Sequence, residues 1–265
     1  MKKNICQIFL FSAFIILLSS CVSQKQIAYF QKAPNESDTI NVAQTYVPKI
    51  QSGDILTIYV NSLNSAASSF FNPYQSSPTV STDAPPGVVS TLSSTTPSGF
   101  LVDASGSIDF PMFGTIKVAG MTTAEARDTI KNKLRTYLKE PTVSVRFQNY
   151  KISVMGEVNH PSVYIIPNEK VTLPEAITMA GDLTIYGKRD NVLIIRSNEG
   201  KKEFGRVNLN SREVFNSPYY YLHSGDLIYV EQGKAKAAQS DQAYRIVPII
   251  LSALTVIGLL IYRVK

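Results

Sequence analysis

The strongest constraint on the fold is an uncharged apolar segment close to the end of the chain, residues 246–262 (IVPIILSALTVIGLLIY). As an α-helix it would be roughly 25 Å long at about 1.5 Å per residue, which is near the lower limit for crossing a bilayer. The bacterial outer membrane is thinner than most membranes, so a short span suits it. The sequence therefore predicts a C-terminal transmembrane helix.

Helical spacing divides this segment into two unequal sides. A narrow stripe of small or polar residues includes Ser252, Thr255, Gly258 and Tyr262, whereas isoleucine, leucine and valine cover the opposite side. One interpretation is a single anchor whose small residues let helices pack closely, and the segment alone favours it, because such residues are common in membrane helices. The other is a ring of helices with the apolar side toward lipid and the stripe lining an aqueous pore.

The N-terminus has the features of a secretory signal peptide. Lys2 and Lys3 precede an apolar run at residues 8–18, which ends in Leu18-Ser19-Ser20-Cys21. This ending resembles the lipobox of bacterial lipoproteins, which are cut before the cysteine and acylated on its sulfur. We therefore expect a signal peptide at 1–20, lipidation of Cys21 and a polar tether at 21–45. The short apolar run IAYF at residues 27–30 is a candidate for docking on the body, although the sequence does not specify how.

Cysteine and charge content agree with an exported chain. Cys6 leaves with the signal peptide and Cys21 carries lipid, so no thiol remains for a disulfide, a cluster or a nucleophile. Without Lys2 and Lys3, 24 of the 26 basic residues remain against 20 acidic ones, a net charge of +4 with no basic tract. Nucleic acid binding is therefore not indicated. Because lipid already anchors the chain, the C-terminal helix is redundant as an anchor and suggests transport through an oligomer.

The region between the tether and residue 148 begins with strand signals. Residues 55–60 are rich in β-forming types and follow the turn sequence Ser52-Gly53-Asp54. Residues 62–98 are then dominated by Ser, Thr, Pro, Asn and Ala, which predicts a mobile insertion in this domain. Its aromatic cluster of Phe70, Phe71 and Tyr74 is interpreted as tacking the loop down.

An internal repeat with an offset of fifty residues follows. Its two copies consist of Gly106, Ile108, Pro111, Thr122, Glu125 and Ala126, and of Gly156, Val158, Pro161, Thr172, Glu175 and Ala176. In each copy Thr-x-x-Glu is a capping box, so helices are expected at 123–138 and at 173–180, the second with a left-handed cap at Gly181. Alternating runs predict strands at 142–147, 151–155, 191–196 and 227–230. The fold class is therefore α+β, with two small β-rich modules.

Residues suited to catalysis or ligand binding are few. His160 and His223 stand without the spacing of a metal site, so no metal, cofactor or catalytic residue is expected. Asp54 and Asp226 could form the acid pair of a glycosidase, but each lies in Ser-Gly-Asp before a strand, which favours a structural turn. Aromatic stacking on sugar is conceivable for a set of tyrosines, although packing between modules is the preferred interpretation. These are Tyr164, Tyr186, Tyr219, Tyr220 and Tyr221.

Several stretches together resemble one family. Residues 48–58 (PKIQSGDILTI), 99–111 (GFLVDASGSIDFP), 114–126 and 141–145 resemble a polysaccharide-export domain, which we place at 46–148. Residues 151–231 are similar to the SLBB module of sugar-export proteins, a β-grasp fold, which we place at 149–232. With a linker at 233–245 and the terminal helix, the chain resembles the Wza-type outer-membrane polysaccharide export lipoproteins.

This resemblance implies a homo-oligomeric ring in the outer membrane, with lipid on Cys21, the modules in the periplasm and the C-terminus toward the exterior. Capsular polysaccharide or exopolysaccharide would pass through the ring, handed over by an inner-membrane polysaccharide copolymerase, without catalysis. An alternative is a lipid-anchored periplasmic protein that binds sugar or acts as an envelope scaffold. An envelope hydrolase using Asp54 or Asp226 is a third hypothesis.

Overall fold

The computed structural model describes most of the two modules and part of each terminal region. The described residues are 27–34, 37–74, 99–198, 200–236, 246–250, 252–253 and 255–258. The elements that they form, apart from the terminal helical residues, are β1 (Ile55–Asn61), α2 (Ser65–Ser69), β2 (Phe100–Leu101), β3 (Ser107–Phe110), β4 (Gly114–Lys117), α3 (Thr123–Leu134), β5 (Thr142–Phe147), β6 (Lys151–Gly156), β7 (Ser162–Ile165), α4 (Leu173–Met179), β8 (Val192–Asn198), β9 (Lys201–Val207), the 3₁₀ helix η2 (Arg212–Asn216) and β10 (Leu227–Val230).

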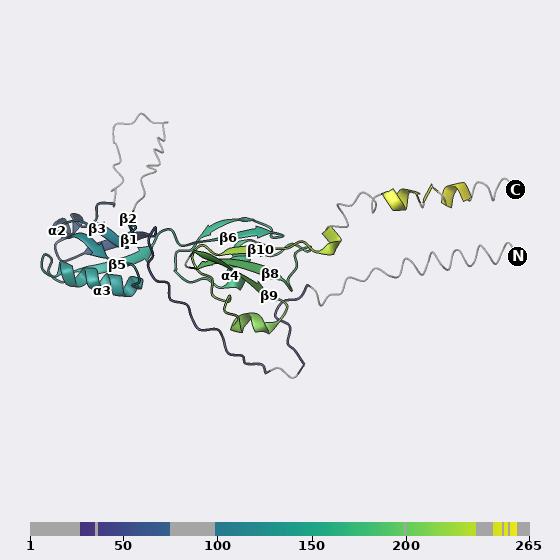
Figure 1. Cartoon of the computed structure of the whole chain (residues 1–265), viewed down its shortest axis with the longest axis horizontal. Coiled ribbons are helices and arrows are strands. Elements are labelled where there is room, and N and C mark those ends of the chain that lie inside the picture. The colour runs from purple at the N-terminus through teal and green to yellow at the C-terminus, as the bar shows by residue number, and fades with distance from the viewer. Residues whose placement is uncertain are drawn as a thin grey trace, which may run out of the picture.

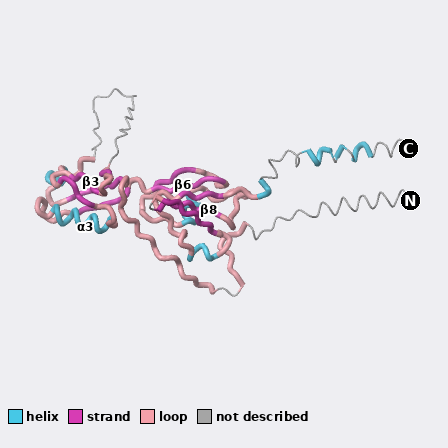
Figure 2. Tube along the Cα trace, in the orientation of Figure 1, coloured by secondary structure: helices cyan, strands magenta, loops and turns pink. Residues whose placement is uncertain are grey.

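The chain folds into two modules that lie end to end, with β1 to β5 in the first and β6 to β10 in the second (Figure 1). Figure 2 shows the strands in two separate groups, each accompanied by short helices. The α+β class with two β-rich modules is thus confirmed.

The first module is built on an antiparallel sheet in the order β2-β1-β5, with the β3–β4 hairpin beside it. Residues alternate along β1, so that Leu56, Ile58 and Val60 are buried. They meet the buried side chains of β5, and α3 packs on β5 through Ile130 and Leu134. The expected strands at 55–60 and 142–147 are present.

The second module is a mixed sheet in the order β7-β6-β10-β8-β9. Its last strand, β10, lies in the middle and pairs in parallel with β6 and antiparallel with β8. The helix α4 packs against β6 and buries Leu173, Ala176 and Ile177. This order is compatible with the expected β-grasp arrangement.

Both predicted capping boxes are present. The hydroxyl of Thr122 accepts from the backbone N–H of Glu125, whose carboxylate accepts from the N–H of Thr122, and Thr172 and Glu175 repeat the arrangement. Gly181, with φ of +73°, lies in the left-handed region directly after the second helix, as expected. The fifty-residue repeat therefore reflects two equivalent helix starts.

Two differences from the sequence predictions concern the bounds and number of elements. The first helix stops at Leu134 instead of 138, and the chain continues in turns to Leu138, which is buried. The strand β9 was not predicted, because KKEFGRV is highly charged. It is an edge strand that pairs only with β8, so its outward side chains are solvated.

The insertion predicted as a mobile loop at 62–98 is ordered in its first part. Asn64 caps α2, and the side-chain amide of Asn72 bonds both the N–H and the carbonyl of Val60, at 2.8 and 2.7 Å. Phe71 is only 3% exposed in the core, whereas Phe70 is exposed. Burial of one aromatic ring therefore outweighs the low-complexity composition here. Residues 75–98 lie outside the described part of the chain.

Candidate functional site

The two modules are joined by a short, well-packed connection. Asn149 accepts the N–H of Ile55 and donates to the carbonyl of Gly53, at 3.0 and 3.1 Å, so it fixes the start of β1. The next residue, Tyr150, is buried, and its hydroxyl donates to the carbonyl of Leu222 at 2.9 Å. Burial raises the pKa of Tyr150 above its ordinary value, so the hydroxyl stays protonated. The joint is therefore anchored in both modules.

The aspartates predicted as turn residues hold matching turns at this joint. Asp54 accepts the N–H of Gln51 and Asp226 accepts the N–H of His223, each at 2.8 Å. The glycine before each aspartate has a φ of +89° or +84°, a region that other residues rarely adopt. The structural interpretation is confirmed for both residues.

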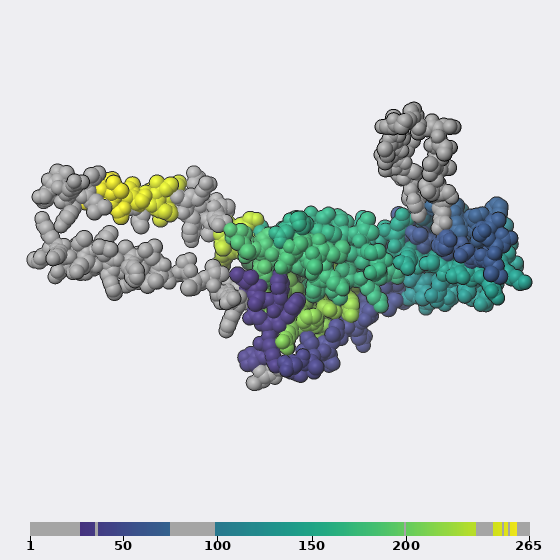
Figure 3. All heavy atoms as spheres, turned by 180° about the vertical axis from the view of Figure 1, so that it is seen from behind, coloured from purple at the N-terminus to yellow at the C-terminus, as the bar shows by residue number. Residues whose placement is uncertain are grey.

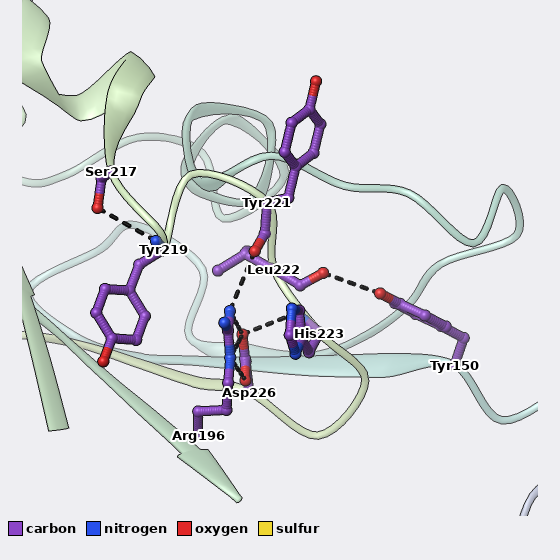
Figure 4. A network of polar contacts seen from close by, with 8 residues as sticks. All are labelled: Tyr150, Arg196, Ser217, Tyr219, Tyr221, Leu222, His223 and Asp226. Atoms are coloured by element: carbon purple, nitrogen blue, oxygen red, sulfur yellow. Dashed lines mark hydrogen bonds and ion pairs between the residues drawn. The ribbon is translucent and has the colours of Figure 1, made fainter. Parts of the chain in front are cut away.

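Asp226 also forms a buried ion pair with Arg196 (Figure 4). The guanidinium donates through Nη2 to Oδ2 at 2.7 Å and through Nε to Oδ1 at 3.0 Å, and Nη2 also donates to the carbonyl of Tyr221. The sequence reasoning missed Arg196. Arg196 could have been recognised from its position two residues after Ile194, which places it on the buried face of β8, where a charged side chain needs a partner.

His223 belongs to this network as a packing residue. Its ring stacks on that of Tyr46, with centroids 3.5 Å apart and planes 18° from parallel. Burial, and then the charge of Arg196, lower the pKa of His223 to about 4, so the ring is neutral at pH 7. No group of three or more His, Cys, Asp and Glu side chains suited to a metal ion occurs among the described residues. The other histidine, His160, contacts the helix end through its backbone N–H, which donates to Ala180.

A cavity of about 340 Å³ opens beside this network, between the two modules, and we call it the junction cavity. Its walls come from the segment leading into the first module, from the Asp54 turn, from the joint and from the β8–β9 hairpin. The lining residues are Tyr46, Pro48, Lys49, Gln51, Asp54, Phe147, Tyr150, Arg196, Ser197, Asn198, Glu203, His223 and Ser224. Partial burial raises the pKa of the Asp54 carboxyl, and the hydrogen bond from Gln51 offsets only part of this effect.

The tyrosines weighed as sugar-stacking candidates are mostly packing residues, in line with the preferred interpretation. Tyr219 lies against Gly205 and under the guanidinium of Arg196, with 5.1 Å between the ring centroid and Cζ. Tyr220 packs on Phe215 and Tyr221, at centroid distances of 5.5 and 5.0 Å. Tyr164 also packs partly buried against the core, and none of the five predicted tyrosines lines the junction cavity.

The described part of the predicted tether, residues 27–34 and 37–45, is docked on the second module, and we call it the strap. Its backbone pairs with the chain before η2, where Phe30 and Gln31 donate to Leu209 and Asn210 at 3.0 and 2.6 Å. The ring of Phe30 packs 5.1 Å from that of Phe215. The strap follows the flank of the second module in the space-filling view (Figure 3). The tether therefore docks through its IAYF run, residues 27–30, and the structure supplies the contacts that the sequence could not specify.

The strap and the C-terminal linker hold the same loop of the second module. The hydroxyl of Tyr29 donates to Asp182 at 2.5 Å, and Arg189 lies over the tyrosine ring. Between these two loop residues, the carbonyl of Tyr186 accepts the N–H of Gly233 at 2.7 Å. Lys236 adds an ion pair with Glu157. The first residues of the predicted linker 233–245 are thus fixed.

The predicted lipidation and pore residues are only partly within the described chain. Ser252, Thr255 and Gly258 lie in helical stretches between residues 246 and 258, where every described side chain is exposed. The hydroxyls of Ser252 and Thr255 each donate to a carbonyl three residues earlier, at 2.8 and 2.7 Å. Cys21 and Tyr262 lie outside the described residues.

Among the residues that the structure describes, no helix has both the length and the apolar character needed to span a bilayer.

Two relatives of known name resemble this chain. Both are called EPS I polysaccharide export outer membrane protein EpsA. The one from Ralstonia nicotianae is 33% identical over 139 residues, which are 51% of this chain and 36% of the relative. The one from Ralstonia solanacearum is 33% identical over 136 residues, 50% of this chain and 36% of the relative. The chain thus spans little more than a third of their length.

Family comparison covers both modules. Residues 42–148 match the family described as polysaccharide biosynthesis/export protein, and residues 150–230 match the SLBB domain. These ranges contain the first sheet with α3 and the mixed sheet with α4, respectively. The chain therefore contains a domain that matches the polysaccharide biosynthesis/export family, followed by an SLBB domain.

Proposed function

We propose that this chain is a non-catalytic subunit of an oligomeric outer-membrane channel that exports capsular polysaccharide or exopolysaccharide. The observation that carries the proposal is the pairing of an export domain with an SLBB domain in one chain. The chain is also 33% identical over 139 residues to a relative named as a polysaccharide export outer membrane protein. The proposed division is signal peptide 1–20, lipidated tether 21–45, export domain 46–148 with the insertion 62–98, SLBB module 149–232, linker 233–245 and transmembrane helix 246–262.

The docking of both terminal segments supports a common membrane end for the molecule. Tyr29 and Gly233 contact residues 182 and 186 of one loop, so the strap and the linker leave the second module at the same place. Cys21 is six residues before Ile27, and six extended residues reach at most about 20 Å. Lipid on Cys21 would therefore hold the SLBB module, and not the export domain, next to the membrane.

The exposed apolar surface of the terminal helix supports a membrane or multimeric environment. Ile249, Ile250 and Val256 are each more than half exposed, which is unfavourable in water. In the proposed ring these residues face lipid, and Ser252, Thr255, Gly258 and Tyr262 line the lumen. A single helix encloses no lumen, so this arrangement needs several copies of the chain.

The remaining partners follow from the proposed path of the glycan. The modules stand in the periplasm, where an inner-membrane polysaccharide copolymerase delivers the polymer, and the C-terminus points to the exterior. Nucleic acid is not among the proposed partners, since the mature charge is small.

The test combines the mass of the detergent-extracted protein with a glycan assay on cells. We expect a closed oligomer, and loss of surface glycan in cells that express a chain lacking residues 246–265. A Cys21→Ser chain is the matched control for anchoring. A monomer that binds oligosaccharide, together with normal surface glycan in the truncated strain, would instead identify a lipid-anchored sugar-binding or scaffolding protein.

A further inference from the structure

The cavity at the joint is a site that neither module forms alone. Tyr46 and Lys49 come from the chain directly after the strap, Asp54 from the first module, and Glu203 and His223 from the second. Its volume of about 340 Å³ lies at the lower end of the roughly 300–1,000 Å³ typical of small-molecule sites, which often form between domains. It therefore suits a small ligand.

The charges around the cavity disfavour an anionic ligand. Arg196 lines it, but its charge is neutralised by Asp226 at 2.7 Å. The other charged lining residues are Lys49, Asp54 and Glu203, so negative groups outnumber positive ones. A phosphate or carboxylate group would therefore gain little electrostatic attraction in this cavity.

The hydrogen-bonding groups suit a ligand with many hydroxyls. A hydroxyl both donates and accepts, and the cavity offers acceptors in Asp54 and Glu203 and a donor in Lys49. The amide of Asn198 donates one hydrogen bond to Oε1 of Glu203 at 3.2 Å, and its second N–H is a further donor. Within the described part of the chain, Asp54 receives one hydrogen bond, at Oδ2, which leaves Oδ1 available. A half-buried carboxylate with one oxygen left without a hydrogen bond is stabilised when a hydroxyl donates to that oxygen.

Aromatic rings complete the surface that a sugar needs. His223 stacks on one face of the Tyr46 ring, Tyr46 as a whole is only half-buried, and Phe147 lines the same cavity. An aromatic ring packs against an apolar face, such as the C–H face of a pyranose, while hydroxyls at the rim meet polar groups. The cavity combines both features in a space that fits a small ligand.

We propose that the junction cavity binds a single unit of a neutral glycan. Asp54 and Glu203 accept hydrogen bonds from its hydroxyls, Lys49 donates to it, and Tyr46 packs against its apolar face. The site rests on the proposed function, because the glycan is then the exported polymer. Ligand in this cavity touches both modules and so couples the glycan to their relative position.

The test uses the full chain in detergent and saturation-transfer NMR with glucose, galactose and glucuronate as probes. We expect saturable binding of at least one neutral hexose and weaker binding of glucuronate. Asp54→Asn and Glu203→Gln should each weaken hexose binding by about tenfold, since each removes a charge-assisted hydrogen bond. The amide introduced by Asp54→Asn retains an oxygen that can accept the Gln51 N–H, so the turn persists.

Two further variants separate binding from folding. Ser224→Phe places a ring in the cavity and should abolish binding. Lys201→Gln, on the same hairpin as Glu203 but outside the cavity lining, should not change it. Thermal unfolding verifies that all variants fold. Absence of saturable hexose binding, or equal binding by Asp54→Asn, Glu203→Gln and the parent chain, overturns the proposal. Tighter binding of glucuronate than of either hexose overturns its neutral character.

The export assay distinguishes this proposal from the proposed function. If the purified chain binds hexose but cells lacking the gene keep their surface glycan, the export function fails and the cavity assignment stands. If glycan export depends on the chain but no hexose binds, the cavity assignment alone fails.

Discussion

Arg196 and Asp226 form an ion pair that is almost completely buried, with side chains 9% and 1% exposed and 2.7 Å between Nη2 and Oδ2. The pair joins β8 to the turn before β10, and this turn carries His223 beside the junction cavity. A buried ion pair contributes little net stability over apolar residues, but removal of one partner leaves an uncompensated charge. Removal of either partner should therefore destabilise the joint more than removal of an ordinary turn residue.

Asp226→Ala should destabilise the SLBB module by about 3–5 kcal/mol, because Arg196 then stays buried without a counter-charge. Asp54→Ala is the matched control, since it removes the same type of turn hydrogen bond without an ion pair, and it should cost about 1.5–3 kcal/mol. Urea unfolding measures both free energies. Equal losses would mean that the ion pair is not the dominant contribution of Asp226.

Lower pH should weaken the fold through His223. Burial and Arg196 lower its folded-state pKa to about 4 from the ordinary 6.5, so the unfolded chain binds a proton more readily than the folded one. The stability conferred by the neutral ring is complete above pH 6.5 and is lost progressively as pH falls toward 4. Unfolding at about pH 7 and pH 5 should show a smaller decrease for His223→Gln than for the parent chain. His160→Gln is the control and should retain the full decrease.

The two capping boxes should contribute similar stability to their modules. Thr122→Ala and Thr172→Ala each remove a side-chain acceptor for the first turn of a helix and should cost about 1 kcal/mol. Serine at either position keeps the hydroxyl and should restore most of this free energy. Chemical denaturation of the four variants provides the measurement, and an alanine variant as stable as its serine counterpart would contradict a capping role.

Gly156→Ala should be strongly destabilising. Gly156 has a φ of +95°, and an added Cβ would overlap the carbonyl of Val230 on the neighbouring central strand. We expect a loss of roughly 3 kcal/mol or more from strain and overpacking together. Gly200, with φ of +78° and open space around its Cβ position, is the matched control, and alanine there should cost about 1–2 kcal/mol. Similar melting temperatures for the two variants would exclude the steric contribution.

Cysteine labelling tests the proposed pore. Single cysteines at 252 and 255 should react with small polar thiol reagents in the assembled protein, because these positions face the proposed lumen. Cysteines at 254 and 257, on the lipid side of the helix, should be protected. The acylated Cys21 would not interfere. Equal reactivity at all four positions would contradict a pore lined by this stripe.

Local features of this fold could be predicted from the sequence alone. The capping boxes join residues three positions apart, and the alternation in β1 and β5 reports which side of a strand is buried. Likewise, Asp54 and Asp226 bond backbone groups three residues away, so the turn interpretation needed only neighbouring residues. Short-range hydrogen bonds and periodic burial depend only on residues that are close in the sequence, so they can be predicted from it.

Other features depend on residues that meet only after folding. Arg196 finds Asp226 thirty positions away, Phe30 packs on Phe215, and Phe71 enters a core formed by distant aromatic rings. Composition predicted a polar tether and a mobile loop for the segments that carry Phe30 and Phe71. It could not specify where either ring would pack, because composition does not record which buried surface is available to an aromatic side chain. The junction cavity likewise exists only where the tertiary structure brings the strap, the first module and the β8–β9 hairpin together, since its walls come from segments with no shared sequence pattern.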